Sequence, residues 1–102
     1  MNTVTQHIKV NNPHGLHMRP VAEISKLAYS FDAIVAFHKN NKIAHGHSVV
    51  ELLMLGVFYG DVIKVTAIGN DAEDALKAIA DYVEKYTDDF SPHDEDADSF
   101  AA

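Results

Sequence analysis

Gly15-Leu16-His17-Met18-Arg19-Pro20 marks the point at which the chain passes from a loop into its first predicted helix. If the helix begins at Met18, His17 occupies the N-cap and Arg19 lies in the first turn. Pro20 also fits the first turn, because an N–H there would have no partner within the helix. The first-turn N–H groups and the positive end of the helix dipole favour a bound anion. The stretch therefore predicts a phosphate-binding helix start with a histidine at its mouth.

The residue types at this helix start suit phosphoryl transfer. A neutral imidazole can attack phosphorus and hold the group in a bond weak enough to pass it on. The helix N-terminus and the guanidinium of Arg19 both disfavour a protonated His17, and the guanidinium fork matches phosphate oxygens. On residue types alone, the alternative is an ordinary loop histidine followed by a solvated arginine.

Alternating and helical apolar patterns follow one another along the first half of the chain. Val4, Gln6, Ile8 and Val10 alternate with polar residues and predict a strand that stops at Asn11-Asn12-Pro13. A helical apolar face follows, made of Val21, Ile24, Leu27, Ala28 and Phe31. Ala33, Val35 and Phe37 then alternate with their neighbours, and Asn40-Asn41 predicts a two-residue turn into a strand over Lys42-Ile43-Ala44.

The second half contains two further helices and one strand. Ser48 and Glu51 form a capping box for a short helix that ends at Gly56 and is apolar nearly all round. Alternation over 62–68 predicts the last strand. The last helix is capped by Asn70 or Asp71 and carries an apolar stripe of Ala72, Ala75, Leu76, Ile79, Val83 and Tyr86.

These patterns predict an α+β fold with the order β-α-β-β-α-β-α. Four strands and three helices of these lengths are best satisfied by an open-faced sandwich, a four-stranded antiparallel sheet with all three helices on one face. The chain has 102 residues, of which 47% are hydrophobic, and this suits one compact domain. We place that domain at residues 1–87.

Charge is unevenly distributed along the chain. Residues 88–102 hold six of the 15 acidic residues and no lysine or arginine, so this tail carries most of the net charge of −7. Its composition predicts a disordered extension. The rest of the chain has no dense basic stripe, which argues against a nucleic-acid partner. The chain has no cysteine, no apolar run of membrane-spanning length and no signal-peptide pattern, so we expect a cytoplasmic protein without membrane insertion.

The stretch over residues 15–20 resembles the G-[LI]-H-x-R-P signature of the histidine-containing phosphocarrier proteins, the HPr family. A second block, Ser48 to Gly56, follows about 30 residues later and resembles the family's second motif. The strand over 62–69 and the helix that begins with Asp71-Ala72-Glu73 resemble its last two elements. The resemblance extends over residues 3–87 without a required gap.

This resemblance implies a relay step in the phosphoenolpyruvate-dependent phosphotransferase system. His17 would accept a phosphoryl group on its Nδ1 from the phosphohistidine of enzyme I and pass it to an enzyme IIA domain in sugar uptake. Arg19 and the backbone N–H groups of Met18 and Arg19 would stabilise the phosphohistidine. The protein would be a covalent carrier and not an enzyme, and we expect a monomer without a cofactor. The second block also resembles nitrogen-related phosphocarriers, so that branch stays open.

The resemblance also implies where the partners dock. An apolar collar would surround His17, and Lys26 and His47 would contribute charge to the same docking surface. The collar residues are Met18, Val49, Val50, Leu53 and Met54.

Ser48 has two readings. Its position resembles the serine that a dedicated kinase phosphorylates in some members, whereas its place in the Ser-x-x-Glu box needs only a capping role. Kinase-regulated members commonly have a lysine before this serine, whereas here His47 precedes it and Glu51 follows. We therefore favour the capping role for Ser48.

Histidines supply an alternative from a different class of function. The chain has seven, and His14, His17, His45 and His47 could converge to bind zinc or nickel. A metal there would occupy His17, and no cysteine completes the set, so we expect no metal site. His45 and His47 would instead place weak positive charge near the acceptor, and His7, His38 and His93 would lie on the surface.

Overall fold

The computed structural model describes residues 2–86, and the acidic tail predicted over residues 88–102 lies outside that range. The elements follow the predicted order. They are β1 (Asn2–Lys9), α1 (Met18–Ser30), β2 (Ile34–Lys39), β3 (Lys42–His45), α2 (Val49–Leu55), β4 (Val62–Gly69) and α3 (Ala72–Lys85). No helix within residues 2–86 has the length and apolar character needed to cross a membrane.

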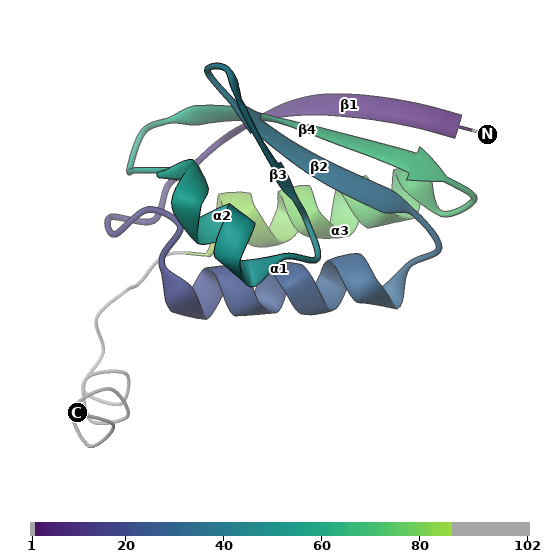
Figure 1. Ribbon diagram of the computed structural model, residues 1–102, viewed down its shortest axis with the longest axis horizontal. Helices are drawn as coiled ribbons and strands as arrows, with labels where there is room; N and C mark the ends of the chain where they lie inside the picture. The colour runs from purple at the N-terminus through teal and green to yellow at the C-terminus, as the bar shows by residue number, and fades with distance from the viewer. Residues whose placement is uncertain (1, 87–102) are drawn as a thin grey trace.

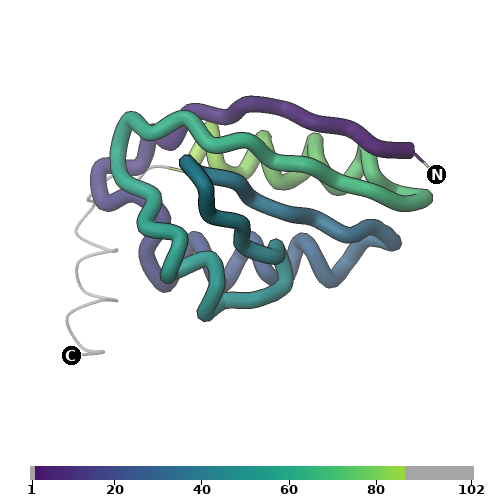
Figure 2. Tube along the Cα trace, turned by 45° about the horizontal axis from the view of Figure 1, so that its top comes forward, coloured from purple at the N-terminus to yellow at the C-terminus, as the bar shows by residue number. Residues whose placement is uncertain are grey.

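The strands form one antiparallel sheet in the order β1-β4-β2-β3. All three helices lie on one side of it, and the other face of the sheet is open, as Figure 1 shows. In Figure 2 the strands run side by side in front of the long helices. The predicted open-faced sandwich is confirmed.

The core lies between the sheet and the helices, and strand alternation decides which side chains enter it. In β4, Ile63, Val65 and Ala67 are fully buried, whereas Val62 and Lys64, which alternate with them, are exposed. Phe37 of β2 and Ile79 of α3 are also fully buried. Burial of this set supplies the main stabilising free energy, at about 25 cal/mol per Å² of apolar surface.

Strand boundaries differ slightly from the prediction. β1 begins earlier and ends before Val10, and β2 extends past Phe37 to Lys39. The extension brings Lys39 opposite Lys42, and the turn between them is the predicted Asn40-Asn41, with Asn40 in the left-handed region at φ 55°. Asparagine tolerates this region better than most residues, which suits the two-residue hairpin.

The predicted caps are partly wrong. Ser48 Oγ accepts a hydrogen bond from the Glu51 N–H at 3.2 Å, but the Glu51 carboxylate does not return to Ser48. It accepts from the backbone N–H of His45 and contacts His45 Nδ1, each at 2.8 Å, so only half of the capping box forms.

Asp71 occupies the N-cap of α3 without making a side-chain cap bond. Its carboxylate accepts instead from the Asp32 N–H at 2.7 Å, and Asn70 donates to the Asp32 carboxylate at 2.8 Å. This exchange joins the β4–α3 turn to the α1–β2 turn, because the two turns are neighbours in space although remote in sequence.

Candidate functional site

His17 lies at the N-cap of α1, as predicted. Its backbone is extended, at φ −95° and ψ −171°, and its carbonyl accepts the first helical bond from the Val21 N–H at 3.1 Å. The imidazole makes no capping hydrogen bond with the helix and is half-buried. It packs edge-on against the ring of His14, with 5.9 Å between centroids. The ring is therefore attached to the fixed backbone of a helix start and remains accessible to solvent.

The first turn of α1 is electropositive. Arg19 is exposed, Pro20 is buried, and the turn contains no acidic residue. The N–H groups of Met18 and Arg19 have no carbonyl partner within the helix, because they belong to its first turn. These features together favour a phosphoryl group carried on His17.

Asn12 organises the loop that precedes His17. It is almost fully buried, its Nδ2 donates to the Gly15 carbonyl at 2.9 Å, and its Oδ1 accepts from the His14 N–H at 3.2 Å. Sequence reasoning treated Asn12 only as a strand stop. An asparagine before a proline is also typical of such side-chain-closed turns, and that signal could have identified its role.

Gly15 is held against the segment that follows α2. It has φ +66°, and a Cβ there would lie 2.3 Å from the Val57 carbonyl oxygen and 2.8 Å from Phe58 Cα. The next residue, Leu16, donates its N–H to the same Val57 carbonyl at 3.0 Å. Residues 56–61, here called the support loop, therefore form one wall of the site. Sequence analysis missed this wall, including Phe58, which is 66% exposed.

The contacts of Asp61 predict that the stability of the protein depends on pH. The Phe58 N–H and, next, the Lys39 ammonium hold the pKa of the Asp61 carboxyl below its ordinary value. Such a group contributes stability that is fully present above the unfolded-state pKa, about 3.9, and is lost as the pH falls through the lower folded-state value. We expect wild type to unfold at higher urea than Asp61→Asn near neutral pH, with the difference shrinking below about pH 4.

Urea unfolding at about pH 7 and about pH 3 measures this difference. Asp81→Asn is the control, because Asp81 pairs with Lys77 at 3.8 Å on the surface of α3. That exposed pair should change stability by less than about 0.5 kcal/mol. A gap between wild type and Asp61→Asn that stays constant with pH contradicts the prediction.

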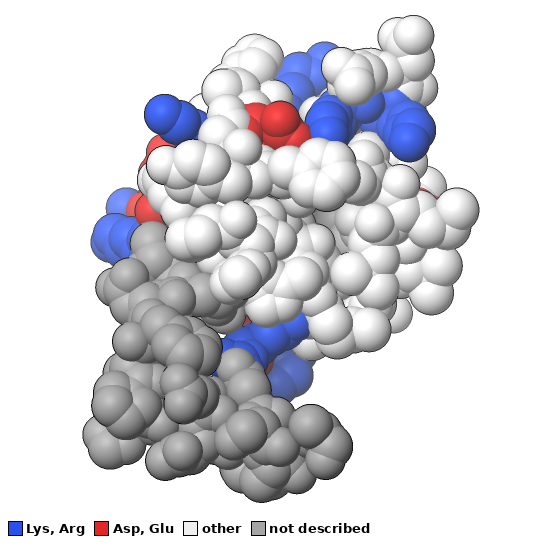
Figure 3. All heavy atoms as spheres, turned by 90° about the vertical axis from the view of Figure 1, so that its left-hand side faces the viewer, with Lys and Arg blue, Asp and Glu red and all other residues white. Residues whose placement is uncertain are grey.

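The predicted collar is partly exposed and partly packed. Met18 is 58% exposed, Val50 65% and Met54 72%, whereas Val49 and Leu53 are half-buried against the core. Figure 3 views this end of the molecule and shows a broad area without charged side chains, with Lys and Arg at its margins. Exposed apolar side chains such as Met18, Val50 and Met54, bordered by charged residues, are typical of a protein-docking face.

The Ser48 end of α2 lies away from His17. His47 packs edge-on against Tyr29, with 5.6 Å between ring centroids. Tyr29 lies near the end of α1, roughly 18 Å along the helix axis from its N-cap at 1.5 Å per residue. His47 therefore lies far along α1 from the acceptor ring. Lys26, predicted to contribute charge, is exposed midway along α1 and contacts Glu23 at 3.4 Å.

The histidines form two pairs and do not converge. His14 contacts His17, and His45 contacts His47 with 5.8 Å between ring centroids. Within residues 2–86, no group of three or more His, Cys, Asp or Glu residues is placed to bind a metal ion. The convergence on which the metal alternative depended is thus wrong.

The remaining predicted surface histidines differ in burial. His7 is exposed, as predicted, but His38 is half-buried. Burial, and then the neighbouring Lys64 ammonium, lower the pKa of His38. His93 lies outside the described residues.

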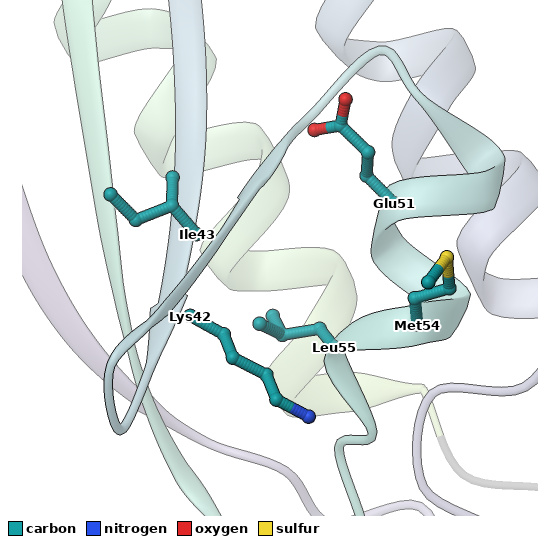
Figure 4. A pocket seen from close by; sticks show the side chains of 5 residues that line it. All are labelled: Lys42, Ile43, Glu51, Met54 and Leu55. Carbon is teal, nitrogen blue, oxygen red and sulfur yellow. The ribbon is translucent and has the colours of Figure 1, made fainter.

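A hollow between β3 and α2 lies to one side of the docking face. It is lined by Lys42 and Ile43 of the hairpin and by Glu51, Met54 and Leu55 of α2, and Figure 4 shows the Lys42 side chain extending toward Leu55. Neither His17 nor Arg19 lines this hollow. The candidate site at the α1 N-terminus therefore lies outside this hollow.

Comparisons with known proteins agree with this arrangement. The family model described as the PTS HPr component phosphorylation site matches residues 4–85. The phosphocarrier protein HPr of Buchnera aphidicola subsp. Acyrthosiphon pisum is 32% identical over 73 residues, covering 72% of this chain and 86% of that protein. The phosphocarrier protein NPr of Escherichia coli K12 is 37% identical over 78 residues, covering 76% of this chain and 87% of that protein. The crystal structure of HPr from Bacillus anthracis matches with a TM-score of 0.76 at 33% identity, covering 79% of this chain and 96% of that one.

The match covers the site as well as the fold. Residues 4–85 include His17, the first turn of α1 and the support loop, and they span nearly all of the sheet and the helices. Phosphocarriers of this kind are covalent intermediates of a phosphotransferase system, and they are not catalysts. The chain belongs to the HPr family of phosphocarrier proteins.

Proposed function

We propose that His17 accepts a phosphoryl group from the phosphohistidine of enzyme I and passes it to an enzyme IIA domain. The lone pair of His17 Nδ1 attacks phosphorus while the bond from phosphorus to the donor imidazole breaks. Transfer to the acceptor histidine reverses these roles. Arg19 and the N–H groups of Met18 and Arg19 balance the negative charge on the carried group.

The observation that supports this proposal most directly is the position of His17 at the N-terminus of α1. A half-buried imidazole at a helix N-terminus, with a guanidinium in the first turn and no acidic residue there, suits a dianionic group. The loop before it is closed by Asn12 and Gly15, so the ring needs little reorganisation when a partner arrives.

The docking surface is proposed to comprise the collar with Lys26 and His47 near its margin. Its most exposed apolar members, Met18, Val50 and Met54, lie on α1 and α2, which pack together. A small apolar patch suits short-lived complexes, because a shuttle must leave each partner after transfer.

Ser48 is proposed to serve mainly as the cap of α2. Its hydroxyl accepts from the Glu51 N–H at 3.2 Å. Glu51, whose pKa is lowered first by the backbone hydrogen bond from His45, adds negative charge next to the hydroxyl that a serine kinase would modify. A monomer acting in the cytoplasm, without a cofactor or a nucleic-acid partner, completes the proposal.

Reconstituted transfer tests the proposal. Enzyme I is incubated with labelled phosphoenolpyruvate and this protein, and we expect one acid-labile label per chain. Addition of a sugar-type or a nitrogen-type enzyme IIA domain then measures which acceptor removes the label faster. Faster loss to the sugar-type domain supports sugar uptake, and faster loss to the nitrogen-type domain assigns the chain to the regulatory branch. Failure to acquire label would reject the proposed function.

Docking through α2 is tested by Met54→Ser. Met54 is 72% exposed, so the substitution removes apolar contact with a partner and little contact within the fold. We expect about a tenfold rise in the enzyme I concentration that gives half-maximal transfer, as for loss of a central interface side chain. The midpoint of thermal unfolding should change little.

Ile34→Ser is the matched control for Met54→Ser. Ile34 is 63% exposed, but it starts β2 at the opposite end of the molecule from the α1 N-terminus (Figure 1). Its substitution should leave transfer unchanged. Equal effects of the two substitutions would show that Met54 has no special part in docking.

A further inference from the structure

Lys39 makes an unusual set of contacts at the end of β2. Its ammonium lies 2.9 Å from Asp61 Oδ2 and 4.8 Å from the centroid of the Phe58 ring, and it donates to the Gly56 carbonyl. The side chain is only 18% exposed, which is low for a lysine. Three different parts of the support loop therefore meet at one cation.

Asp61 completes this arrangement. The same oxygen that contacts Lys39 accepts the Phe58 N–H at 2.8 Å, and the Asp61 N–H donates to the Phe58 carbonyl at 3.0 Å. A charge-assisted hydrogen bond is about twice as strong as a neutral one, and partial burial protects it from screening by salt. The backbone of the support loop is thereby fixed around the Lys39 ammonium.

The support loop is in turn bonded to both sides of the segment that leads to His17. Val10, where the chain leaves β1, exchanges two backbone hydrogen bonds of 2.9 Å with Gly60 and Asp61. At the other side Leu16 donates to Val57 at 3.0 Å, directly before His17. Gly15 lies so close to Val57 that no side chain fits between them. A shift of the support loop must therefore displace the backbone that carries the imidazole.

We propose that Lys39 is a positioning residue for phosphoryl transfer, which fixes the support loop and through it the orientation of His17. It acts through Val57 and Leu16 and does not touch the carried group. This inference rests on the proposed function, since it concerns how the acceptor is held. A positively charged side chain is required, because the anchor points are a carboxylate, a carbonyl and an aromatic face.

Rapid-quench measurement of transfer from phosphorylated enzyme I tests this role with Lys39→Met and Lys39→Arg. Lys39→Met keeps an apolar stem and removes the cation. We expect the rate constant at saturating donor to fall about tenfold, the donor concentration for half-maximal rate to change less than about threefold, and Lys39→Arg to recover most of the rate. The final amount of acid-labile label should equal that of wild type.

Amide hydrogen exchange supplies a readout that does not depend on transfer. In Lys39→Met we expect the Leu16 N–H to exchange about tenfold faster, while the N–H of Val65 in the core strand keeps its protection. A general loss of stability would raise both rates together. Local loosening at Leu16 alone supports the positioning role.

Two variants serve as controls. Lys64→Met removes the same charge from the open face of the sheet, and Ile79→Val lowers the unfolding temperature by loosening the core. Both should transfer at the wild-type rate. A normal rate in Lys39→Met, or an equal loss in Lys64→Met or Ile79→Val, overturns the inference. Absence of label in wild type would instead refute the proposed function, so the two failures are distinguishable.

Discussion

Replacement of His17 by alanine is expected to abolish phosphoryl transfer through this protein. Among the groups proposed to contact the carried phosphoryl group, the His17 imidazole supplies the nucleophile, because a guanidinium acts only as a hydrogen-bond donor and the other contributors are backbone N–H groups. Labelling from phosphoenolpyruvate and enzyme I should fall from one group per chain to background. Stability should change by less than about 1 kcal/mol, since the ring makes no capping bond to α1.

His14→Ala is the matched control for His17→Ala. Its ring lies 5.9 Å from that of His17, so it shares the same loop and the same edge-on contact. His14→Ala and Ser48→Ala should both retain acid-labile label at full stoichiometry. Label that persists in His17→Ala, or that disappears in His14→Ala, would assign the acceptor to a different residue and contradict our site.

Gly15→Ala is expected to cause the largest loss of stability among single changes around the site. Alanine must adopt φ +66° there, which costs about 1–2 kcal/mol, and its Cβ would lie 2.3 Å from the Val57 carbonyl oxygen. Because both clashing partners are backbone, the loop has to move. We expect the free energy of unfolding to fall by roughly 3–4 kcal/mol in urea titrations, and transfer to slow because His17 moves with the loop.

Gly60→Ala separates the cost of a positive φ from the cost of the steric clash. Gly60 also has a positive φ, +87°, but a Cβ there would meet nothing within 4 Å. The free energy of unfolding of Gly60→Ala should therefore fall only by the conformational cost, about 1 kcal/mol. Phosphoryl transfer through this variant should be nearly normal. Similar losses in the two variants would show that the contact between Gly15 and the support loop does not hold the site.

Sequence periodicity was enough to predict the element order and the buried faces. Val65 and Ile79 are fully buried as their patterns require, because alternation in a strand and a 3.6-residue period in a helix follow directly from backbone geometry. The site at the α1 N-terminus was predictable for the same reason. His17, Arg19 and Pro20 are consecutive or nearly so, and a helix start fixes their relative positions without any long-range contact.

Caps proved less predictable than helices. Ser48 and Asp71 both occupy N-cap positions, yet Glu51 bonds to His45 and Asp71 bonds to Asp32. A carboxylate at a helix start has several backbone N–H groups within reach once distant turns come together. Local sequence identifies the position of a cap, but it does not identify the partner that the carboxylate takes.

The sequence by itself determined the α+β order, the buried stripes and the helix start that carries His17 at its N-cap, because each depends on residues close together in the chain. Only the tertiary structure decided that Lys39, Phe58 and Asp61 meet beside Gly15 and that the four candidate metal-binding histidines separate into two pairs. Those relations depend on how β2, α2 and the support loop pack against the loop before α1. Packing of that kind follows from side-chain volume and charge across long sequence separations, which periodicity does not record.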